Sequence, residues 1–349
     1  MLSMSVKLIE KTETGIETYR ITNKNGLYAE VITFGARIHR LVVPDKNGVF
    51  ADVVAGFDSP EGYRGENPYF NAIIGRTVNR IGNARFTLNG KEYKLFVNDA
   101  KNCLHGGKVG FDSRIFTVSV PDENGNELRL TYVSPDGEEG YPGTLSLTVT
   151  YTLSDENALG IRYDATCDED TVFNPTNHAY FNLDGDFKSI LDTELYLNSH
   201  RLTESDDELI CHGDIADITG TAFDFSTPKT IGKDINAPHK YFENAHGGYD
   251  FNYVIDKKCD GKELCARAVS HKSGRVMEVY TDRPCVQLYT GNFLDGTLPT
   301  RIRLPKQSTL CLETQGYPNA CNVPTFPSIT LKKGEKFSSV TEYVFSVEK

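Results

Sequence analysis

The chain has 349 residues, 39% of them hydrophobic and 11% aromatic, and a formal net charge of −11. This length and composition are typical of a globular protein and exclude a disordered chain or a minimal module. The acidic excess is scattered, which argues against nucleic acid or an anionic membrane as a partner. The N-terminal segment MLSMSVKLIEKTETG lacks the apolar stretch of a secretory signal, and no long apolar run follows. We therefore expect a cytoplasmic protein without a membrane span.

Cysteine usage agrees with a reducing compartment. The eight cysteines form no C-x-x-C pair, and the sequence contains no H-E-x-x-H motif. In a chain of this length without a signal, we interpret them as reduced, partly buried thiols and not as a disulfide framework. Since zinc sites use paired Cys or His ligands at short spacing, we expect no metal site.

The first third of the chain shows turns and one short helical segment. Residues 59–64 are among the few that could form a helical turn. In RFTLNGKEYKL, residues 85–95, an Asn-Gly pair separates two short alternating runs, as in a tight β-hairpin. Asn-Gly pairs begin at positions 25, 47, 89 and 124. These turns predict antiparallel sheets.

The clearest strands lie in the middle of the chain. Apolar and polar residues alternate over 145–153 and again over 159–167, with a turn at 155–157, which predicts two neighbouring strands. Residues 202–248 are less regular, and we expect long loops there. No repeat and no linker is present. We predict an all-β chain with few short helices, and favour a single sandwich domain over 1–349 above two separable domains.

Three segments place polar side chains where a strand or its end is expected. In NPTNHAYFNLDG, residues 174–185, alternation puts His178 and Tyr180 on one face and Phe181 on the other. In STLCLETQGYPNACN, residues 308–322, Leu310 and Leu312 oppose the face of Glu313, just before Gly and Pro end the strand. Both predicted faces carry hydrogen-bonding groups near a sheet rim.

Two further segments suggest a binding loop. NCLHGGKVGFD places His105 before two glycines, which permit unusual backbone angles and the close approach of a ligand. GRTVNRIG supplies Asn79 and Arg80, and a guanidinium suits vicinal hydroxyls or a carboxylate. Each feature alone has a structural explanation, such as a satisfied buried histidine, a solvated glutamate or a surface ion pair. Their joint position at strand ends favours a polar site.

These segments occur in an ordered series that resembles a known family. The series comprises GFDSPEGY, GRTVNRIGNARFTLNGKEYKL, NCLHGGKVGFD, NPTNHAYFNLDG, GGYDFNYV, VQLYTGNFL and LETQGYPNACN, with TFGARIHRLVVPDKNG before it. Together they are similar to the aldose 1-epimerase (galactose mutarotase) family over nearly the whole chain. The resemblance implies a large antiparallel β-sandwich of the supersandwich kind, with a carbohydrate cleft on one sheet.

The resemblance also implies site residues and a ligand. It carries His178 over as general acid and Glu313 as general base, with His105 beside them. The positions that correspond to sugar contacts are Asn79, Arg80, His105, Tyr180, Asp250 and Gln287. The implied partner is a free aldohexose, with no cofactor and no metal, in a monomer or homodimer. Phe293 is a candidate for stacking on the apolar face of a sugar.

The implied chemistry fits a glutamate and a histidine. Interconverting the α and β anomers opens the ring, which removes a proton from the C1 hydroxyl and adds one to the ring oxygen. A base and an acid across that bond can do both in one step and exchange roles for ring closure. Ordinary pKa values of about 4.3 and about 6.5 suit this pair. No redox step occurs and no group leaves, so nothing in the reaction calls for a nucleotide.

Three departures from the family pattern and three alternative functions remain. Asn71, Phe116 and Asn319 stand where Gly, Trp and Asp are common, and they affect the expected shape of the cleft rim. A hexose-6-phosphate 1-epimerase would need extra cationic residues. A carbohydrate-binding or sensing protein would have no use for both His178 and Glu313, and a glycosidase would use Asp250 with Glu313 as opposed carboxylates.

Overall fold

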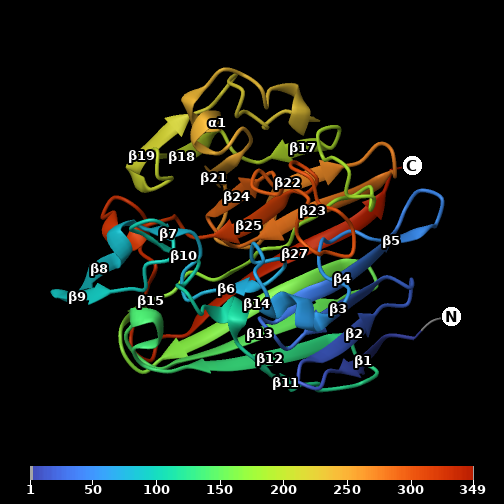
Figure 1. Cartoon of the computed structure of the whole chain (residues 1–349), viewed down its shortest axis with the longest axis horizontal. Coiled ribbons are helices and arrows are strands. Elements are labelled where there is room, and N and C mark those ends of the chain that lie inside the picture. Colours follow the sequence, from blue (N-terminus) through green and yellow to red (C-terminus); the bar gives the residue numbers. More distant parts are fainter. Residues whose placement is uncertain (1–2, 349) are drawn as a thin grey trace.

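A sheet of nine antiparallel strands extends through most of the computed structural model, which describes residues 3–348 (Figure 1). Its strands alternate between apolar side chains on the inner face and polar ones on the outer face, as in the burial pattern of residues 145–153. In spatial order they are β11 (Thr117–Ser119), β12 (Glu127–Ser134), β13 (Leu145–Leu153), β14 (Ala158–Cys167), β27 (Phe337–Val347), β23 (Arg275–Thr281), β22 (Glu263–Val269), β17 (Glu194–Leu197) and β20 (Lys229–Thr230).

Two five-stranded antiparallel sheets accompany it. The N-terminal sheet contains β1 (Ser5–Lys11), β2 (Glu17–Thr22), β3 (Tyr28–Ile32), β4 (Arg37–Pro44) and β5 (Phe50–Asp52). The other, here called the β25 sheet, has the order β19 (Cys211–Asp217), β18 (Arg201–Ser205), β21 (Asp250–Val254), β24 (Cys285–Tyr289) and β25 (Cys311–Gln315).

Short ladders and helical turns connect these sheets. The two-stranded ladders pair β6 (Ile73–Ile74) with β16 (Thr176–Asn177), β7 (Arg80–Ile81) with β10 (Cys103–Leu104), β8 (Arg85–Leu88) with β9 (Lys91–Lys94), and β15 (Thr171–Val172) with β26 (Thr330–Leu331). The helices are α1 (Lys240–Asn244) and the 3-10 turns η1 (Pro60–Arg64), η2 (Gly82–Ala84), η3 (Phe111–Ser113), η4 (Glu138–Gly140), η5 (Ile231–Lys233) and η6 (Ala320–Asn322).

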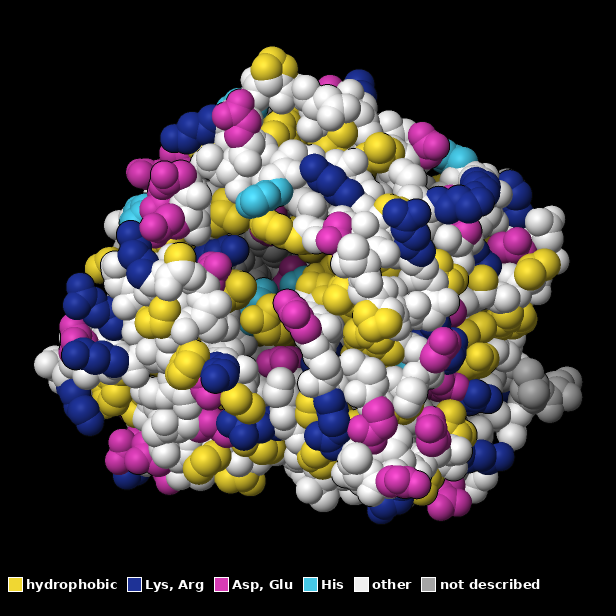
Figure 2. Space-filling model, in the orientation of Figure 1, with side chains coloured by type: hydrophobic (Ala, Val, Ile, Leu, Met, Phe, Trp, Pro, Cys, Tyr) yellow, Lys and Arg dark blue, Asp and Glu magenta, His cyan; other side chains and the backbone are white. Residues whose placement is uncertain are grey.

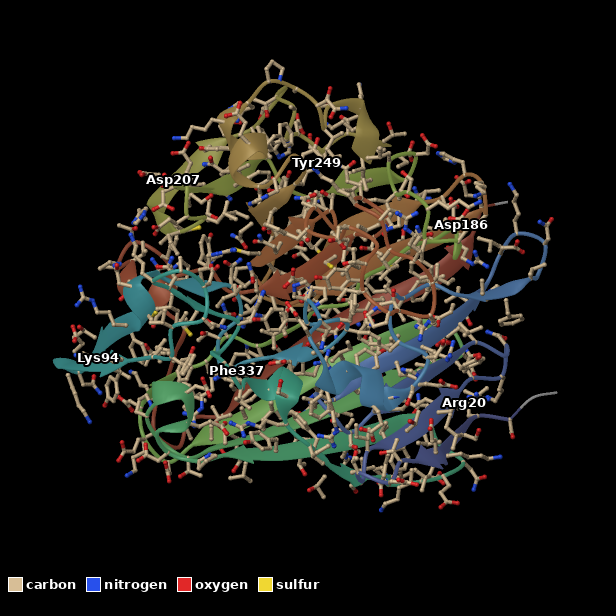
Figure 3. All side chains as sticks on the ribbon, viewed as in Figure 1. Arg20, Lys94, Asp186, Asp207, Tyr249 and Phe337 are labelled. Atoms are coloured by element: carbon tan, nitrogen blue, oxygen red, sulfur yellow. The ribbon has the colours of Figure 1, made fainter. Side chains whose placement is uncertain are left out.

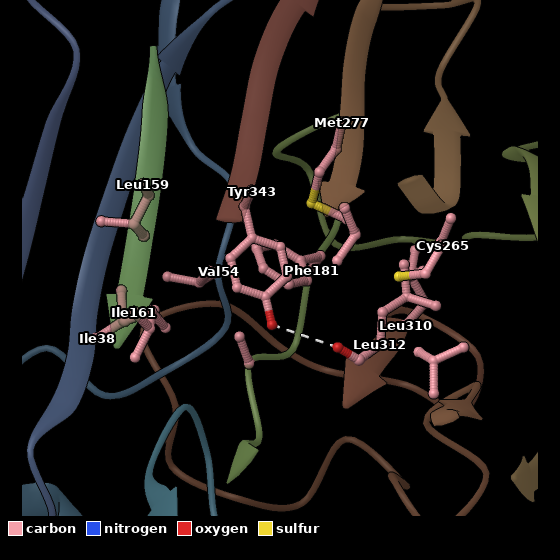
Figure 4. Packing of buried hydrophobic residues seen from close by; sticks show 14 of the residues in the cluster. Ile38, Val54, Leu159, Ile161, Phe181, Cys265, Met277, Leu310, Leu312 and Tyr343 are labelled. Carbon is pink, nitrogen blue, oxygen red and sulfur yellow. Dashed lines mark hydrogen bonds between the residues drawn. The ribbon is translucent and has the colours of Figure 1, made fainter. Parts of the chain in front are cut away.

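Both five-stranded sheets pack on the inner face of the nine-stranded sheet. One continuous cluster of buried apolar residues draws members from all three sheets, among them Ile38, Ile161 and Leu312 (Figure 4). Tyr343 of β27 reaches across this core, and its hydroxyl donates to the carbonyl of Leu312 at 3.3 Å (Figure 4). The apolar face of β25 is thereby anchored, and its opposite face is available for other groups.

Most local predictions are confirmed. β13 and β14 pair in register from Leu145–Cys167 to Leu153–Leu159, and β8 and β9 form the predicted hairpin. The short helical segment is η1, which Ser59 caps through its side chain. All eight cysteines are free, and only Cys259 is exposed. Within residues 3–348, no helix is long and apolar enough to cross a membrane.

Two predictions about regular secondary structure need correction. Residues 202–248, expected to form loops, also contain most of β18, all of β19 and the helix α1. The pattern hides them because β19 is an edge strand with mostly exposed side chains and its pairing with β18 has a register shift after Thr203. Conversely, the segment around His178 is a regular strand only at Thr176–Asn177.

Candidate active site

The β25 sheet supplies one wall of a cleft through strand pairing. Gln287 of β24 lies directly opposite Glu313 of β25, and Asp250 of β21 lies opposite Tyr289. In an antiparallel pair, side chains opposite each other point to the same face. Because Leu312 of β25 points into the core, Glu313 points the other way, as alternation along a strand requires.

The segment after β16 brings His178 and Tyr180 to the same cleft. The backbone of His178 donates to the carbonyl of Ala72, and Phe181 exchanges two backbone hydrogen bonds with Leu310 beside β25. The alternation predicted from the sequence holds without a regular strand, because Phe181 enters the main core. The rings of His178 and Tyr180 stack with centroids 5.0 Å apart.

The loop with the His-Gly-Gly sequence holds His105 against this pair. The rings of His105 and His178 meet edge to face with centroids 5.2 Å apart. His105 itself has a left-handed backbone, with φ 54°. At Gly106, φ is +94° and a Cβ atom would overlap the carbonyl oxygen of Gly75, so only glycine fits. Gly106 was predicted to allow the close approach of a ligand, but it allows the close approach of the backbone at Gly75 instead.

An amide network links the predicted sugar-contacting residues. The side chain of Asn79 donates to Oε1 of Gln287 at 3.1 Å, and Nε2 of Gln287 donates to Oδ1 of Asp250 at 2.7 Å. Arg80 donates through Nε to Oδ2 of Asp99 at 2.7 Å. Both side-chain ends of Gln287 are hydrogen-bonded, whereas the terminal nitrogens of Arg80 form no hydrogen bond within residues 3–348.

These residues surround a cleft of about 170 Å³. This volume is below the range of about 300–1,000 Å³ for drug-sized ligands and suits one sugar ring better than a nucleotide. Figure 2 shows this face of the molecule hollowed near its centre, with histidine and acidic side chains inside. The lining residues are Pro68, Tyr69, Asn79, Arg80, Leu104, His105, His178, Tyr180, Asp250, Gln287, Tyr289, Phe293 and Glu313.

The structure therefore brings together every site residue predicted from the sequence. Phe293, the candidate stacking residue, lies at the rim and is 51% exposed. Four lining residues escaped the sequence analysis: Pro68, Tyr69, Leu104 and Tyr289. Tyr289 had a signal, since it stands two positions after Gln287 on the same strand face. Tyr69 had none, because its position depends on a left-handed backbone, with φ 62°.

His178 and Glu313 lie close together in the cleft. Nε2 of His178 lies 3.6 Å from Oε1 of Glu313, and the residues are 5% and 2% exposed. Burial lowers the pKa of His178 to about 3, and nearby Arg37 contributes. Burial also raises the pKa of Glu313 well above its ordinary value; Asp250 adds to this and Arg80 opposes it. These shifts place the proton of the pair on Glu313 and leave His178 neutral, because burial disfavours charge on each.

His105 is oriented as a hydrogen-bond donor. Its Nδ1 accepts from the backbone N–H of Asn79 at 3.2 Å, which leaves the proton of the neutral ring on Nε2. Burial lowers the pKa of His105, followed by the effects of His178 and Arg80, so the ring is neutral.

That tautomer bears on metal binding. Ligand atoms of His105, His178 and Glu313 all lie within 4.8 Å of one another, a donor set that could in principle hold a metal ion. A metal would need the lone pair on Nε2 of His105, which requires a proton on Nδ1 facing the N–H of Asn79. The donor set therefore fits hydrogen bonding to a ligand better than it fits a metal.

Comparison with known proteins identifies the family. The family model for aldose 1-epimerase matches residues 17–344. Galactose mutarotase from Sus scrofa is 45% identical over 324 residues, which cover 92% of each chain. Aldose 1-epimerase from Escherichia coli K12 is 34% identical over 332 residues, or 94% of each chain. The chain belongs to the aldose 1-epimerase family.

Solved structures agree with this assignment. The crystal structure of an aldose epimerase homologue from C. elegans matches 99% of this chain and 100% of its own, with a TM-score of 0.86 and 30% identity. The predicted fold, a large antiparallel sandwich with few short helices, is confirmed.

None of the three departures from the family pattern lines the cleft. Asn71 has φ 56°, its side chain donates to Ala55, and it accepts from the backbone N–H of Tyr180. Phe116 is in the main core. Asn319 donates to the carbonyl of Cys211. Only Asn71 touches the segment that carries His178.

Proposed function

We propose that this chain is an aldose 1-epimerase that interconverts the α and β anomers of free hexoses, with galactose and glucose as substrates. The observation that supports this most directly is the His178–Glu313 pair at 3.6 Å in a cleft of about 170 Å³. Family membership and the galactose mutarotase relatives support the substrate class.

In the proposed mechanism, Glu313 takes the proton from the C1 hydroxyl and His178 gives a proton to the ring oxygen. This assignment requires the proton of the pair to pass from Glu313 to His178 when the sugar binds. Burial and Asp250 keep the pKa of Glu313 high, and Arg80 opposes them, so Arg80 acts in the direction of that transfer. After rotation about the C1–C2 bond, the two residues act in reverse and close the ring. The site ends with the proton count with which it began.

The remaining polar residues position the sugar. Nε2–H of His105 is available to a hydroxyl or to the ring oxygen. Arg80, held by Asp99, offers a fork of donors, and Asp250 offers an acceptor. Asn79 and Gln287 hold Asp250 in place through their amides. Tyr180 and Phe293 lie at the side of the cleft where an apolar sugar face can rest.

The test is polarimetry on freshly dissolved α-D-galactose at pH 7, with and without the protein. We expect faster relaxation to the same final rotation. Glu313→Gln should slow the enzymatic rate by about 10²–10⁴-fold. Its thermal midpoint should not fall, because the amide replaces a buried carboxyl that is costly to ionise. A rate equal to the spontaneous one with galactose and glucose would refute the proposal.

The electrostatics of the cleft disfavour a phosphorylated hexose as substrate. Arg80 is the only Lys or Arg among the lining residues, and it pairs with Asp99. Asp250 and Glu313 line the same space. A dianionic phosphate would therefore meet one cation and two carboxyl groups. A rate enhancement greater with glucose 6-phosphate than with glucose would reverse this preference.

We also propose a cytoplasmic location and a monomer or homodimer. The cysteines support the first point, since eight thiols remain free and most are buried. Size-exclusion chromatography with light scattering would distinguish the two oligomeric states.

A further inference from the structure

A second cavity, about 360 Å³ and therefore larger than the cleft, lies at the far end of β25. Strand β26, the end of β25 and the start of β27 surround it, and Figure 3 labels Phe337, which begins β27. Its lining includes Arg283, Gly316, Tyr317, Ser328, Lys336 and Phe337. None of them lines the sugar cleft.

Arg283 is the unusual member of this lining. Its Nη2 donates to Oδ1 of Asn174 at 2.7 Å, and its guanidinium lies over the ring of Phe337 at 5.3 Å. Its Nε is buried and has no hydrogen-bond partner among residues 3–348. The adjacent Asp282 directs both carboxylate oxygens to the backbone N–H of Val340, at 3.1 and 3.2 Å. No carboxylate of the described residues forms an ion pair with Arg283.

An arginine in this state lacks the partner that it usually has. A guanidinium carries five N–H donors in a rigid fork. Nε of Arg283 is closed to any ligand, whereas Nη1 forms no hydrogen bond within residues 3–348 and is not among the buried atoms, so it is the donor open to an anion. A phosphate supplies several acceptor oxygens in a geometry that matches the fork. Lys336 is exposed at the same cavity and Ser328 adds a hydroxyl, while Glu335 is the carboxylate of the lining.

We propose that this cavity binds a small organic phosphate. The phosphate lies on Arg283 and Lys336, and the organic part rests against Tyr317 and Phe337. This site is separate from the sugar cleft and does not depend on the proposed reaction.

The cavity shares a structural element with the cleft. Oδ1 of Asn174, which holds Arg283, also accepts from the backbone N–H of Gly316 at 2.7 Å. Gly316 follows β25, the strand of Glu313. A Cβ atom at Gly316 would lie 3.0 Å from Nη2 of Arg283, so guanidinium and strand end are in close contact. An anion on Arg283 therefore contacts a side chain that is fixed to the strand of the catalytic wall.

Isothermal titration calorimetry with α-D-glucose 1-phosphate tests the proposal. This compound has no free anomeric hydroxyl, so it cannot be turned over, and excess galactose is present to fill the cleft. We expect saturable binding by the wild type and at least tenfold weaker binding by Arg283→Gln. Lys336→Gln, at an exposed position, should weaken binding about threefold or more. Arg162→Gln makes the same charge change on the outer face of β14 and should bind as the wild type does.

Each other outcome counts against the site. Absence of binding by the wild type at 10 mM ligand, or equal affinity in Arg283→Gln and Arg162→Gln, would overturn the proposal. Binding that occurs only when galactose is left out would place the ligand in the sugar cleft and overturn it as well. If Arg283→Gln fails to fold by circular dichroism, Lys336→Gln decides. Galactose mutarotation by each variant is measured in parallel, so that a failure of the proposed reaction is seen separately.

Discussion

In the nine-stranded sheet and in the cleft wall, side chains alternate between a core face and an outward face, but the two outward faces differ. In β13, the side chains of the outer face are small and polar. They are exposed or half-buried, so they add little unfavourable free energy to folding. In β25, the face opposite the core carries Glu313 and Gln315, and both are buried. Burial of such groups opposes folding unless they are paired, and it shifts their pKa values. β25 thus holds buried polar side chains on its outward face, one of which we propose serves the reaction, whereas the outward side chains of β13 are half-buried or exposed.

Substitution of His178 should give the largest effect that tests this difference between the two regions. His178→Asn should lower the rate constant for galactose mutarotation by about 10²–10⁴-fold, because the asparagine has no proton to donate at neutral pH. The thermal midpoint should stay close to that of the wild type. Polarimetry and differential scanning calorimetry on the same samples check both points. Near-normal turnover would remove the acid role from His178.

The reverse pattern is expected in the nine-stranded sheet. Leu147 of β13 is 1% exposed, and Leu147→Ala should lower the free energy of unfolding by about 2–5 kcal/mol. The folded variant should keep its rate constant, because the cleft lies on another sheet. Urea denaturation gives the stability, with Ser146→Ala on the outer face as control, expected within about 0.5 kcal/mol. A loss of turnover in folded Leu147→Ala would show that the two regions are coupled.

Arg80→Ala sharpens the comparison within the cleft. Loss of a charge-assisted hydrogen bond of about 1.5–3 kcal/mol should raise KM roughly 10- to 150-fold. The effect on kcat should be smaller, because Arg80 acts on the His178–Glu313 pair only electrostatically, without a direct contact. Initial rates over a range of galactose concentrations separate the two constants. An unchanged KM would contradict the binding role, and Arg162→Ala provides an exposed control.

The pH dependence of stability tests the burial of His178. Burial lowers the pKa of His178 to about 3, so its contribution to stability is complete above pH 6.5 and is lost as the pH falls toward 3. The unfolding free energy of the wild type should therefore fall more steeply over this range than that of His178→Asn, by at most about 1.4 kcal/mol per pH unit. Urea titrations at several pH values measure the slopes.

An exposed histidine provides a control of opposite sign. A hydrogen bond to Asp256 raises the pKa of His200. The stabilising effect of His200 is therefore present at low pH, and it is lost as the pH rises through the raised pKa of the folded protein. His200→Gln should therefore leave the acid-side slope intact. Equal slopes for His178→Asn and the wild type would mean that His178 is not held neutral by burial.

The single-domain prediction and the oligomeric state stay predictions, since neither follows from the geometry of one chain. The roles of the site residues are likewise proposals, although their convergence in one cleft is a structural fact.

The sequence by itself determined the local elements and the composition of the site. Strands such as Leu145–Leu153 follow from period-two alternation, and the turn at Asn89 follows from its glycine neighbour. These are short-range effects of backbone geometry and burial. The ordered motifs also indicated the family and therefore His178 and Glu313.

Only the tertiary structure decided where those side chains meet. The side chains of Asn79 and Gln287 are hydrogen-bonded although 208 positions separate them, and no periodicity of the sequence encodes such a contact. The left-handed backbone of Tyr69 and the half-buried Arg283, whose Nε has no hydrogen-bond partner within residues 3–348, are also invisible in the sequence. Each depends on the packing of distant segments, which sets backbone strain, burial and therefore the pKa values that make the cleft reactive.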